Sequence, residues 1–174
     1  MQNSQKQAIW RFWQYEFYLG LRVGELAALK WSGWEDETTL HIVREEVREQ
    51  ESNLRYVADH TKTNHDRFVA VPPKAIELLN KIPKQSEYIF TRDGERITSR
   101  QIAYVLEKYA ERQGVQTKST HKMRKTYASL LASNGVPLDA IRELLGHTDL
   151  STTLGYIYNP LPEKDAYEMI SKAL

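Results

Sequence analysis

Apolar residues recur at three- and four-residue spacing near the start of the chain and again through its second half. In the first such stretch, Ser4 to Tyr18, the apolar positions are mostly aromatic and include Ile9, Phe12, Trp13 and Phe17. This period predicts an amphipathic helix. Gly20 ends the pattern, and a second short helix is expected over Gly24 to Trp31.

Three short segments in the first half of the chain alternate instead with a period of two. They are rich in β-branched residues and span Thr38–Val43, Leu54–Ala58 and Arg67–Val71. Such alternation between polar turns predicts strands, and an antiparallel three-stranded sheet is the simplest arrangement. Pro72 and Pro73 end the third strand and suit the first turn of a helix over residues 74–81. A brief extended stretch is expected over Tyr88–Phe90.

Capping and glycine signals divide the second half into further helices. Thr98 and Gln101 have the spacing of a capping box and open a helix that Gly114 ends. Other helices are expected over residues 120–133, 137–145 and 149–156, with a tail helix over 162–174. No repeat or linker divides the chain. The fold class predicted for residues 1–174 is a single domain, mainly α with a small antiparallel three-stranded β-sheet.

Composition excludes several classes of protein. The 174 residues contain no cysteine, which rules out disulfide scaffolds, cysteine zinc sites and thiol nucleophiles. No apolar run approaches the roughly 20 residues that span a bilayer. Residues 1–7 lack the apolar core of a signal peptide. The sequence therefore predicts a cytoplasmic protein with no membrane partner.

The net charge of +1 conceals two segments of opposite sign. Residues 35–51 carry seven acids and two bases, a net charge of −5, whereas residues 92–125 carry nine bases and four acids, a net charge of +5. The whole-chain sum alone gives no support for a nucleic-acid partner. The acidic segment is expected to face away from any bound phosphate or to meet another protein.

Six residues form a set suited to phosphoryl transfer without a metal ion. They are two arginines, two histidines, a lysine and a tyrosine, namely Arg22, Lys62, His121, Arg124, His147 and Tyr156. The planar fork of arginine matches the nonbridging oxygens of a phosphodiester, and imidazole can add a further donor. Tyrosine becomes a covalent nucleophile once a neighbour takes its proton, and lysine can protonate an alkoxide leaving group. Each residue alone is typical of a surface or helix-end position, so only the set indicates this chemistry.

The order of these motifs resembles that of the tyrosine recombinases, also called the phage integrase family. The matching segments are Leu19–Leu26, Thr61–Thr63, His121–Arg124, Leu145–His147 and Thr152–Tyr156, with Trp31 following Ala28-Leu29-Lys30. His147 and Tyr156 are nine residues apart, which is the usual interval in the family. The resemblance runs from about Tyr18 to Ile157. Each motif is weak, but the ordered set is highly specific.

The resemblance implies a tyrosine recombinase catalytic-domain fold and a cleavage mechanism on double-stranded DNA. Tyr156 would attack the scissile phosphate, leaving a 3′-phosphotyrosyl link and a free 5′-hydroxyl. Arg22 and Arg124 would hold the nonbridging oxygens, and His147 would donate a further hydrogen bond to them. Because the phosphotyrosine keeps the energy of the broken bond, no cofactor, metal or small-molecule substrate is implied.

The remaining roles follow from the same resemblance. His121 would act as general base towards the tyrosine, and Lys62 as general acid for the 5′-oxygen. Glu25 matches the acidic residue that supports the site by holding a neighbouring histidine or arginine. Two alternatives stay open: Tyr158 is a second candidate nucleophile, although the spacing favours Tyr156, and Lys74 lies close enough in sequence to replace Lys62.

The family also implies partners. Full-length members carry an N-terminal helical DNA-binding domain, which the residues before Trp10 could not form. They act as tetramers on DNA, in which the tail segment commonly docks on the neighbouring protomer. The chain is therefore expected to be the catalytic half, to bind DNA weakly and to lose that binding readily with salt. The tail helix is expected to pack either on a neighbouring copy or on its own domain.

Other functions remain open from the sequence. Val136–Tyr156 also resembles the helix-turn-helix of a DNA-binding regulator, and a degenerate integrase would bind DNA without cutting it. Neither would require Arg22, Arg124, His147 and Tyr156 together. A type IB topoisomerase-like nicking-closing enzyme shares the tyrosine, arginine and lysine chemistry, but the combination of H-x-x-R with L-G-H favours a recombinase.

Overall fold

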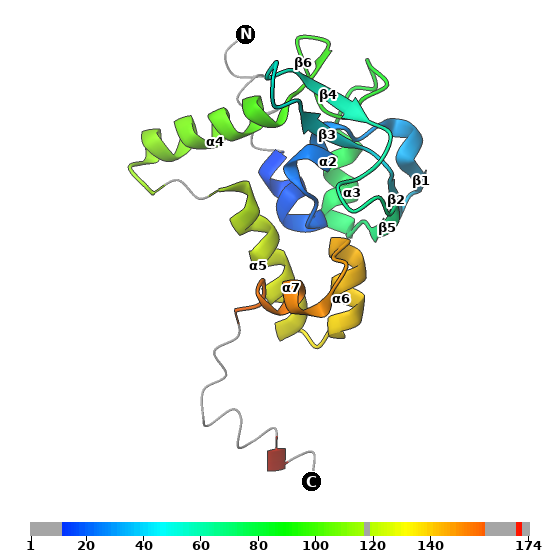
Figure 1. The fold of residues 1–174 in the computed structure, drawn as a ribbon, viewed down its shortest axis with the longest axis vertical. Helices are drawn as coiled ribbons and strands as arrows, with labels where there is room; N and C mark the ends of the chain where they lie inside the picture. Colours follow the sequence, from blue (N-terminus) through cyan, green and yellow to red (C-terminus); the bar gives the residue numbers. More distant parts are fainter. Residues whose placement is uncertain (1–11, 117–118, 159–169, 172–174) are drawn as a thin grey trace.

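The described strands gather in one part of the molecule, and the helices of residues 120–154 make up another part beneath it (Figure 1). The computed structural model describes residues 12–116, 119–158 and 170–171. Within these ranges no helix is long and apolar enough to cross a membrane. The predicted fold class, mainly helical with a small antiparallel three-stranded sheet, is confirmed.

The helices lie close to where the periodicity predicts them. Their bounds are α2 Val23–Ala27, α3 Pro73–Leu79, α4 Ser99–Gln113, α5 Thr120–Ser133, α6 Leu138–Leu145 and α7 Leu150–Leu154, preceded by helical residues 12–19. Residues 4–11 of the first predicted helix lie outside the described residues. The exception is α2, which was expected to reach Trp31. It ends at Ala27 because the next backbone pairs elsewhere: Leu29 O accepts a 2.9 Å hydrogen bond from Ile89 N. The tail helix expected over 162–174 lies outside the described residues except for 170–171.

In the part of the chain that the structure describes, the strands form three small antiparallel sheets rather than one. Their bounds are β1 Trp34–Asp36, β2 Thr39–Ile42, β3 Glu45–Arg48, β4 Arg55–Ala58, β5 Arg67–Ala70, β6 Thr91–Arg92 and β7 Glu95–Arg96. The three-stranded sheet has the order β1-β2-β5, while β3 pairs with β4 and β6 with β7. The expectation that Leu54–Ala58 joins the three-stranded sheet was therefore wrong. The hydrophobic pattern did not indicate β3, the strand that pairs with β4, because β3 begins with two buried carboxylates, Glu45 and Glu46.

Glu46 is the centre of a buried polar cluster that fixes the start of α4. Its carboxylate accepts hydrogen bonds from Arg55 at 3.2 Å, from Arg96, and from the backbone of Ser99 at 3.0 Å. Burial raises the pKa of Glu46, but the hydrogen bonds from Ser99 and Arg96 outweigh it and lower the pKa below its usual value. Part of the acidic segment is thus neutralised inside the fold.

The described residues form two hydrophobic cores. The seam between them is the boundary where β5 and α6 meet. The larger core fills the part that contains the strands and includes Leu19, Leu26, Leu40, Val69 and Ile102. The smaller core consists of Ala128, Ile141 and Leu145, with Tyr156 among the residues packed against it. Because α6 packs beside β5, the polar residues along this seam are held between the two cores.

Gly20 allows α5 to pack closely against the end of the first helical segment. Its φ of +60° is left-handed, and a Cβ at this position would overlap the ring of Tyr127. We expect Gly20→Ala to lower the free energy of unfolding by about 2–4 kcal/mol, from backbone strain and an overpacked ring contact together. Urea denaturation measures the change.

Gly114→Ala is the matched control for this prediction. Gly114 has a φ of +63°, but a Cβ there would have no atom within 4 Å, so only backbone strain of about 1–2 kcal/mol is expected. Equal losses of stability in the two variants would show that the contact with Tyr127 contributes nothing.

Candidate active site

Five of the predicted site residues meet at the seam between the two cores. Arg22 immediately precedes α2, His121 and Arg124 lie on α5, and His147 and Tyr156 flank α7. These residues are far apart along the chain but close together in space. The site therefore exists only when both parts of the molecule are folded and docked.

Arg124 is a buried cation that joins the two parts. Its side chain is 2% exposed and donates to Gly20 O at 2.6 Å and to Leu145 O. Burial lowers the pKa of Arg124 and the charge of Glu25 opposes that shift, but a guanidinium stays protonated at neutral pH. Arg124 Nε has no hydrogen-bond partner among the described residues. A buried guanidinium with a spare donor is suited to binding an anion.

Arg22 is held in place by Glu25. The Glu25 carboxylate accepts hydrogen bonds from the Arg22 backbone at 2.8 Å and from its guanidinium at 2.7 Å. Arg22 also donates to Gly146 O at 3.0 Å. Although burial alone would raise the pKa of Glu25, hydrogen bonds and charge from Arg67, with the other two arginines, lower it to about 2. Glu25 is therefore ionised at neutral pH and keeps Arg22 aligned.

Arg67 belongs to the site but was absent from the residues that the sequence indicated. It lies on β5 and donates to both oxygens of Glu25 and to Leu144 O, each at 2.8 Å. One signal was available. The period of two places Arg67 on the same face of the strand as Val69, which is fully buried, and an inward-facing arginine requires a buried acceptor.

Glu16 is a second buried group near Arg124 that the sequence did not indicate. Its side chain is 1% exposed, and Oε2 has no hydrogen-bond partner in the described part of the chain. Burial raises the pKa of Glu16 to about 8, against the opposing charge of Arg124. Glu16 is thus protonated at pH 7, so Glu25 is the ionised carboxylate that faces Arg124.

His147 is oriented by a hydrogen bond to α7. The preceding Gly146 adopts a left-handed φ of +61° that ends α6. The turn places His147, 6% exposed, with Nδ1 3.0 Å from the hydroxyl of Thr153. Burial and then the charge of Arg124 lower the pKa of His147 to about 4. The ring is therefore neutral at pH 7, and its Nε2 is the nitrogen left to serve a ligand.

Tyr156 contacts both histidines. Its hydroxyl lies 3.3 Å from His121 Nδ1, and its ring meets those of His121 and His147 edge-on, with centroids 4.8 and 4.6 Å away. Lys125 Nζ lies 5.2 Å from the centre of the same ring. Burial, followed by the charges of Lys125 and Arg124, lowers the pKa of His121. A neutral imidazole beside a phenol is the arrangement of a nucleophile and its base.

The second candidate nucleophile lies apart from this cluster. The side chain of Tyr158 is 81% exposed, and its backbone N–H donates to Ser129 Oγ at 3.0 Å. The hydroxyl of Tyr156, by contrast, meets His121. The geometry therefore favours Tyr156, in agreement with the spacing.

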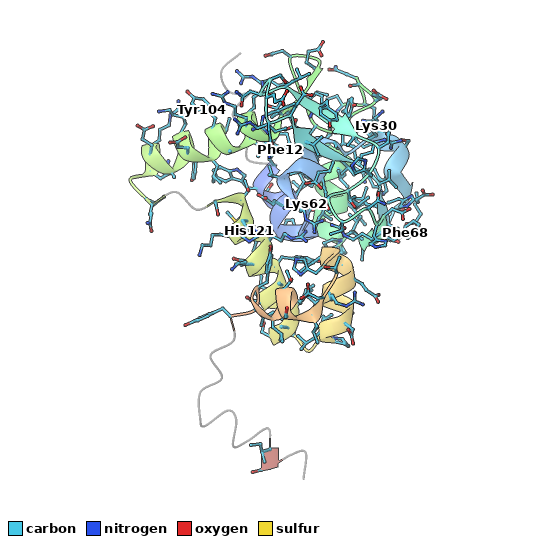
Figure 2. The ribbon with its side chains drawn as sticks, viewed as in Figure 1. Phe12, Lys30, Lys62, Phe68, Tyr104 and His121 are labelled. Carbon is cyan, nitrogen blue, oxygen red and sulfur yellow. The ribbon has the colours of Figure 1, made fainter. Side chains whose placement is uncertain are left out.

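The structure does not bring Lys62 into contact with the cluster. Lys62 is exposed in the turn between β4 and β5, where its backbone N–H donates to Glu45 Oε2 at 2.7 Å. Its ammonium group forms no ion pair with any residue that the structure describes. Figure 2 labels Lys62 in the part that contains the strands and His121 on α5. Lys74 is likewise exposed, on α3, so the role of the general acid stays a prediction.

Comparison of the sequence with known proteins gives one consistent family. The model of the phage integrase family matches residues 3–162. The chain is 34% identical over 145 residues to a tyrosine recombinase XerA from Thermococcus onnurineus (strain NA1), covering 79% of this chain and 46% of that relative. It is 28% identical over 174 residues to a tyrosine recombinase XerC-like protein from Caldanaerobacter subterraneus subsp. tengcongensis, covering 85% and 44%. The chain thus spans about half the length of the curated relatives that it matches.

Solved structures share the fold. The Tn1549 transposon integrase in complex with transposon right end DNA matches with a TM-score of 0.82 at 17% identity, covering 97% of this chain and 60% of that chain. The crystal structure of XerA recombinase matches with a TM-score of 0.69 at 20% identity, covering 98% and 57%. At these identities the likeness establishes the architecture.

Proposed function

This chain belongs to the phage integrase family, and from that premise we propose that it cleaves and rejoins double-stranded DNA in site-specific recombination through a 3′-phosphotyrosyl intermediate. The observation that carries the proposal is the 3.3 Å separation between Tyr156 Oη and His121 Nδ1. Two arginines and His147 lie beside this pair. A tyrosine next to a proton acceptor and to donors for phosphate oxygens meets the requirements of that step.

In the proposed cleavage step, Tyr156 Oη attacks the scissile phosphorus. Its proton passes to His121, a phosphorus–oxygen bond to tyrosine forms, and the bond to the 5′-oxygen breaks. The departing oxygen takes a proton from Lys62 and becomes a 5′-hydroxyl. Rejoining reverses the step, with a 5′-hydroxyl from another strand attacking the phosphotyrosine.

The charge that develops on the phosphate is held by three side chains. Arg22 and Arg124 approach from opposite sides of the seam and offer guanidinium donors to the nonbridging oxygens. His147 offers one further donor. Because these groups are fixed before DNA arrives, they cost little reorganisation during the reaction.

This chain is proposed to be the catalytic part of a larger recombinase assembly. Residues 1–174 are proposed to form one catalytic domain that acts with other protomers as a tetramer on DNA in the cytoplasm. The substrates are proposed to be sites of a mobile element or of a chromosome. The two docked cores, which share one site, support treating these residues as a single unit.

The proposal is tested with a library of nicked suicide duplexes whose arms are randomised in sequence. Cleavage near the nick releases a short fragment and traps the protein on DNA, which is recovered under denaturing conditions and sequenced. We expect an adduct with a shared sequence motif, formed equally well in a chelator. Absence of any adduct from the wild-type chain, or its loss in chelator, would contradict the proposal.

The rate of adduct formation is expected to depend on pH through His121. Burial and the neighbouring cations lower the pKa of His121 below 6.5, so its neutral, proton-accepting form persists into mildly acidic solution. We expect the single-turnover rate to hold at pH 6.5 and to fall at lower pH as the imidazole becomes protonated. His121→Gln should be roughly 10²-fold slower and flat over this range, since glutamine does not titrate. An acid limb that remained in His121→Gln would assign it to another group.

A further inference from the structure

All three guanidinium nitrogens of Arg67 form hydrogen bonds, and the bonds reach both parts of the molecule. The two terminal nitrogens donate to the two oxygens of Glu25, which lies on α2, and Nε donates to Leu144 O at the end of α6, each at 2.8 Å. The guanidinium also fills the space above Gly146, where an added Cβ would lie 3.0 Å from it. The Arg67 side chain is 8% exposed. These bonds fix the separation between α2 and the end of α6.

Each of the two anchored segments carries a group of the proposed phosphate site. Glu25 binds Arg22 through both backbone and side chain. The end of α6 leads directly into His147, and Gly146 O accepts from Arg22 at 3.0 Å. A shift of Arg67 would therefore move Arg22 and His147 relative to one another. Reaction rates are sensitive to misplacements of about 1 Å.

We propose that Arg67 is a positioning residue for DNA cleavage, which sets the distance between Arg22 and His147 by bridging Glu25 and the end of α6. The inference rests on the proposed function, since it concerns the same cleavage step. This bridging role requires the forked guanidinium of an arginine. A lysine keeps the charge but offers one nitrogen, so it cannot bind two carboxylate oxygens and a carbonyl in one plane.

The first test replaces the fork and keeps the charge. We expect Arg67→Lys to slow single-turnover adduct formation by roughly 30- to 100-fold on a duplex selected by the wild-type chain. Affinity for the same duplex, measured with Tyr156→Phe also present, should change by less than about threefold. The slowing comes from misplaced groups rather than from lost DNA contact.

Arg96→Lys is the matched control. Arg96 is a partly buried arginine on β7 that donates to the buried carboxylate of Glu46, so it undergoes the same chemical change beside a different acid. Glu46 also binds Arg55 and Ser99, and Arg96 also donates to Ala27 O at the end of α2 at 3.5 Å; none of these partners is a group of the site. We expect Arg96→Lys to cleave within about threefold of the wild-type rate. Thermal unfolding of both variants shows that each is folded in the assay, and Arg67→Gln replaces Arg67→Lys if the latter is not.

A pH profile separates positioning from a general structural effect. Glu25 faces Arg22, Arg67 and Arg124, and its burial favours the protonated form. Without Arg67 it should bind a proton at higher pH, so the rate of Arg67→Met relative to wild type should fall from about pH 8 to about pH 5.5. With Glu25→Gln as the background, removal of Arg67 should give a ratio that does not vary with pH.

The outcomes distinguish this inference from the proposed function. Wild-type-like cleavage by folded Arg67→Lys overturns the inference and leaves the function standing. The inference is also overturned by an equal loss of DNA affinity, by equal slowing in Arg96→Lys, or by a pH-dependent ratio in the Glu25→Gln background. Failure of the wild-type chain to form any adduct overturns the function itself.

Discussion

Tyr156→Phe is expected to abolish the covalent protein–DNA adduct while leaving DNA affinity unchanged. Phenylalanine keeps the ring that meets His121 and His147 edge-on and removes only the hydroxyl. Without that oxygen no phosphate ester can form, so the loss should exceed about 10⁴-fold and reach the detection limit. The measurement is the fraction of labelled suicide duplex that migrates with the protein on a denaturing gel.

Tyr158→Phe is the matched control for this result. The residue lies two positions further along the chain and is 81% exposed, so the same atom is removed outside the cluster. We expect Tyr158→Phe to cleave at the wild-type rate. Survival of the adduct in Tyr156→Phe, together with its loss in Tyr158→Phe, would transfer the nucleophile to the second tyrosine.

Arg124→Lys is expected to reduce the single-turnover rate by about 10³-fold or more. The guanidinium of Arg124 spans the seam by binding Gly20 O and Leu145 O and still has an unpartnered Nε among the described residues. A lysine in its place keeps the charge but cannot bind both carbonyls and a phosphate oxygen at once. Because the missing interaction is strongest at the transition state, the loss should appear in the rate more than in DNA affinity.

A surface arginine provides the comparison for Arg124. Arg112 lies exposed in the last turn of α4, and Arg112→Lys should leave the cleavage rate within about twofold of wild type. Thermal unfolding of Arg124→Lys is measured alongside, because the variant also loses a link between the two cores. If Arg124→Lys is folded and cleaves within tenfold of wild type, Arg124 does not hold the phosphate.

The helices could be predicted from the sequence where their signals are local. The capping box of Thr98 and Gln101 is present, with Thr98 N donating to Gln101 Oε1 at 2.8 Å, and Gly114 ends α4 in a left-handed conformation. The C-terminal bound of α5 matches because Gly135, with a left-handed φ of +79°, directly follows its C-cap Asn134. Strand pairing was harder to predict, because β3 has no alternating apolar pattern and is paired through backbone contacts with β4.

The residues of the candidate site likewise fall into those with a local sequence signal and those without one. The arginines, histidines and tyrosine could be picked out because each stands in a short motif with a fixed order along the chain. The period of two indicates only that Arg67 faces inward; its partner Glu25 is 42 residues away, and no local pattern links the two. The protonated state of Glu16 likewise depends on burial that only the assembled cores provide.

The hydrogen bond between Arg22 and Gly146 joins residues 124 positions apart, which has a consequence for the chain during its synthesis. At ribosomal speeds Arg22 is made roughly ten seconds before Gly146, and Tyr156 is made later still. A chain made only as far as Gly146 therefore contains Arg22 and Arg124 but lacks His147 and the nucleophile Tyr156. The proposed cutting chemistry would arise only after this late long-range closure, so an unfinished chain could not nick nearby DNA during translation.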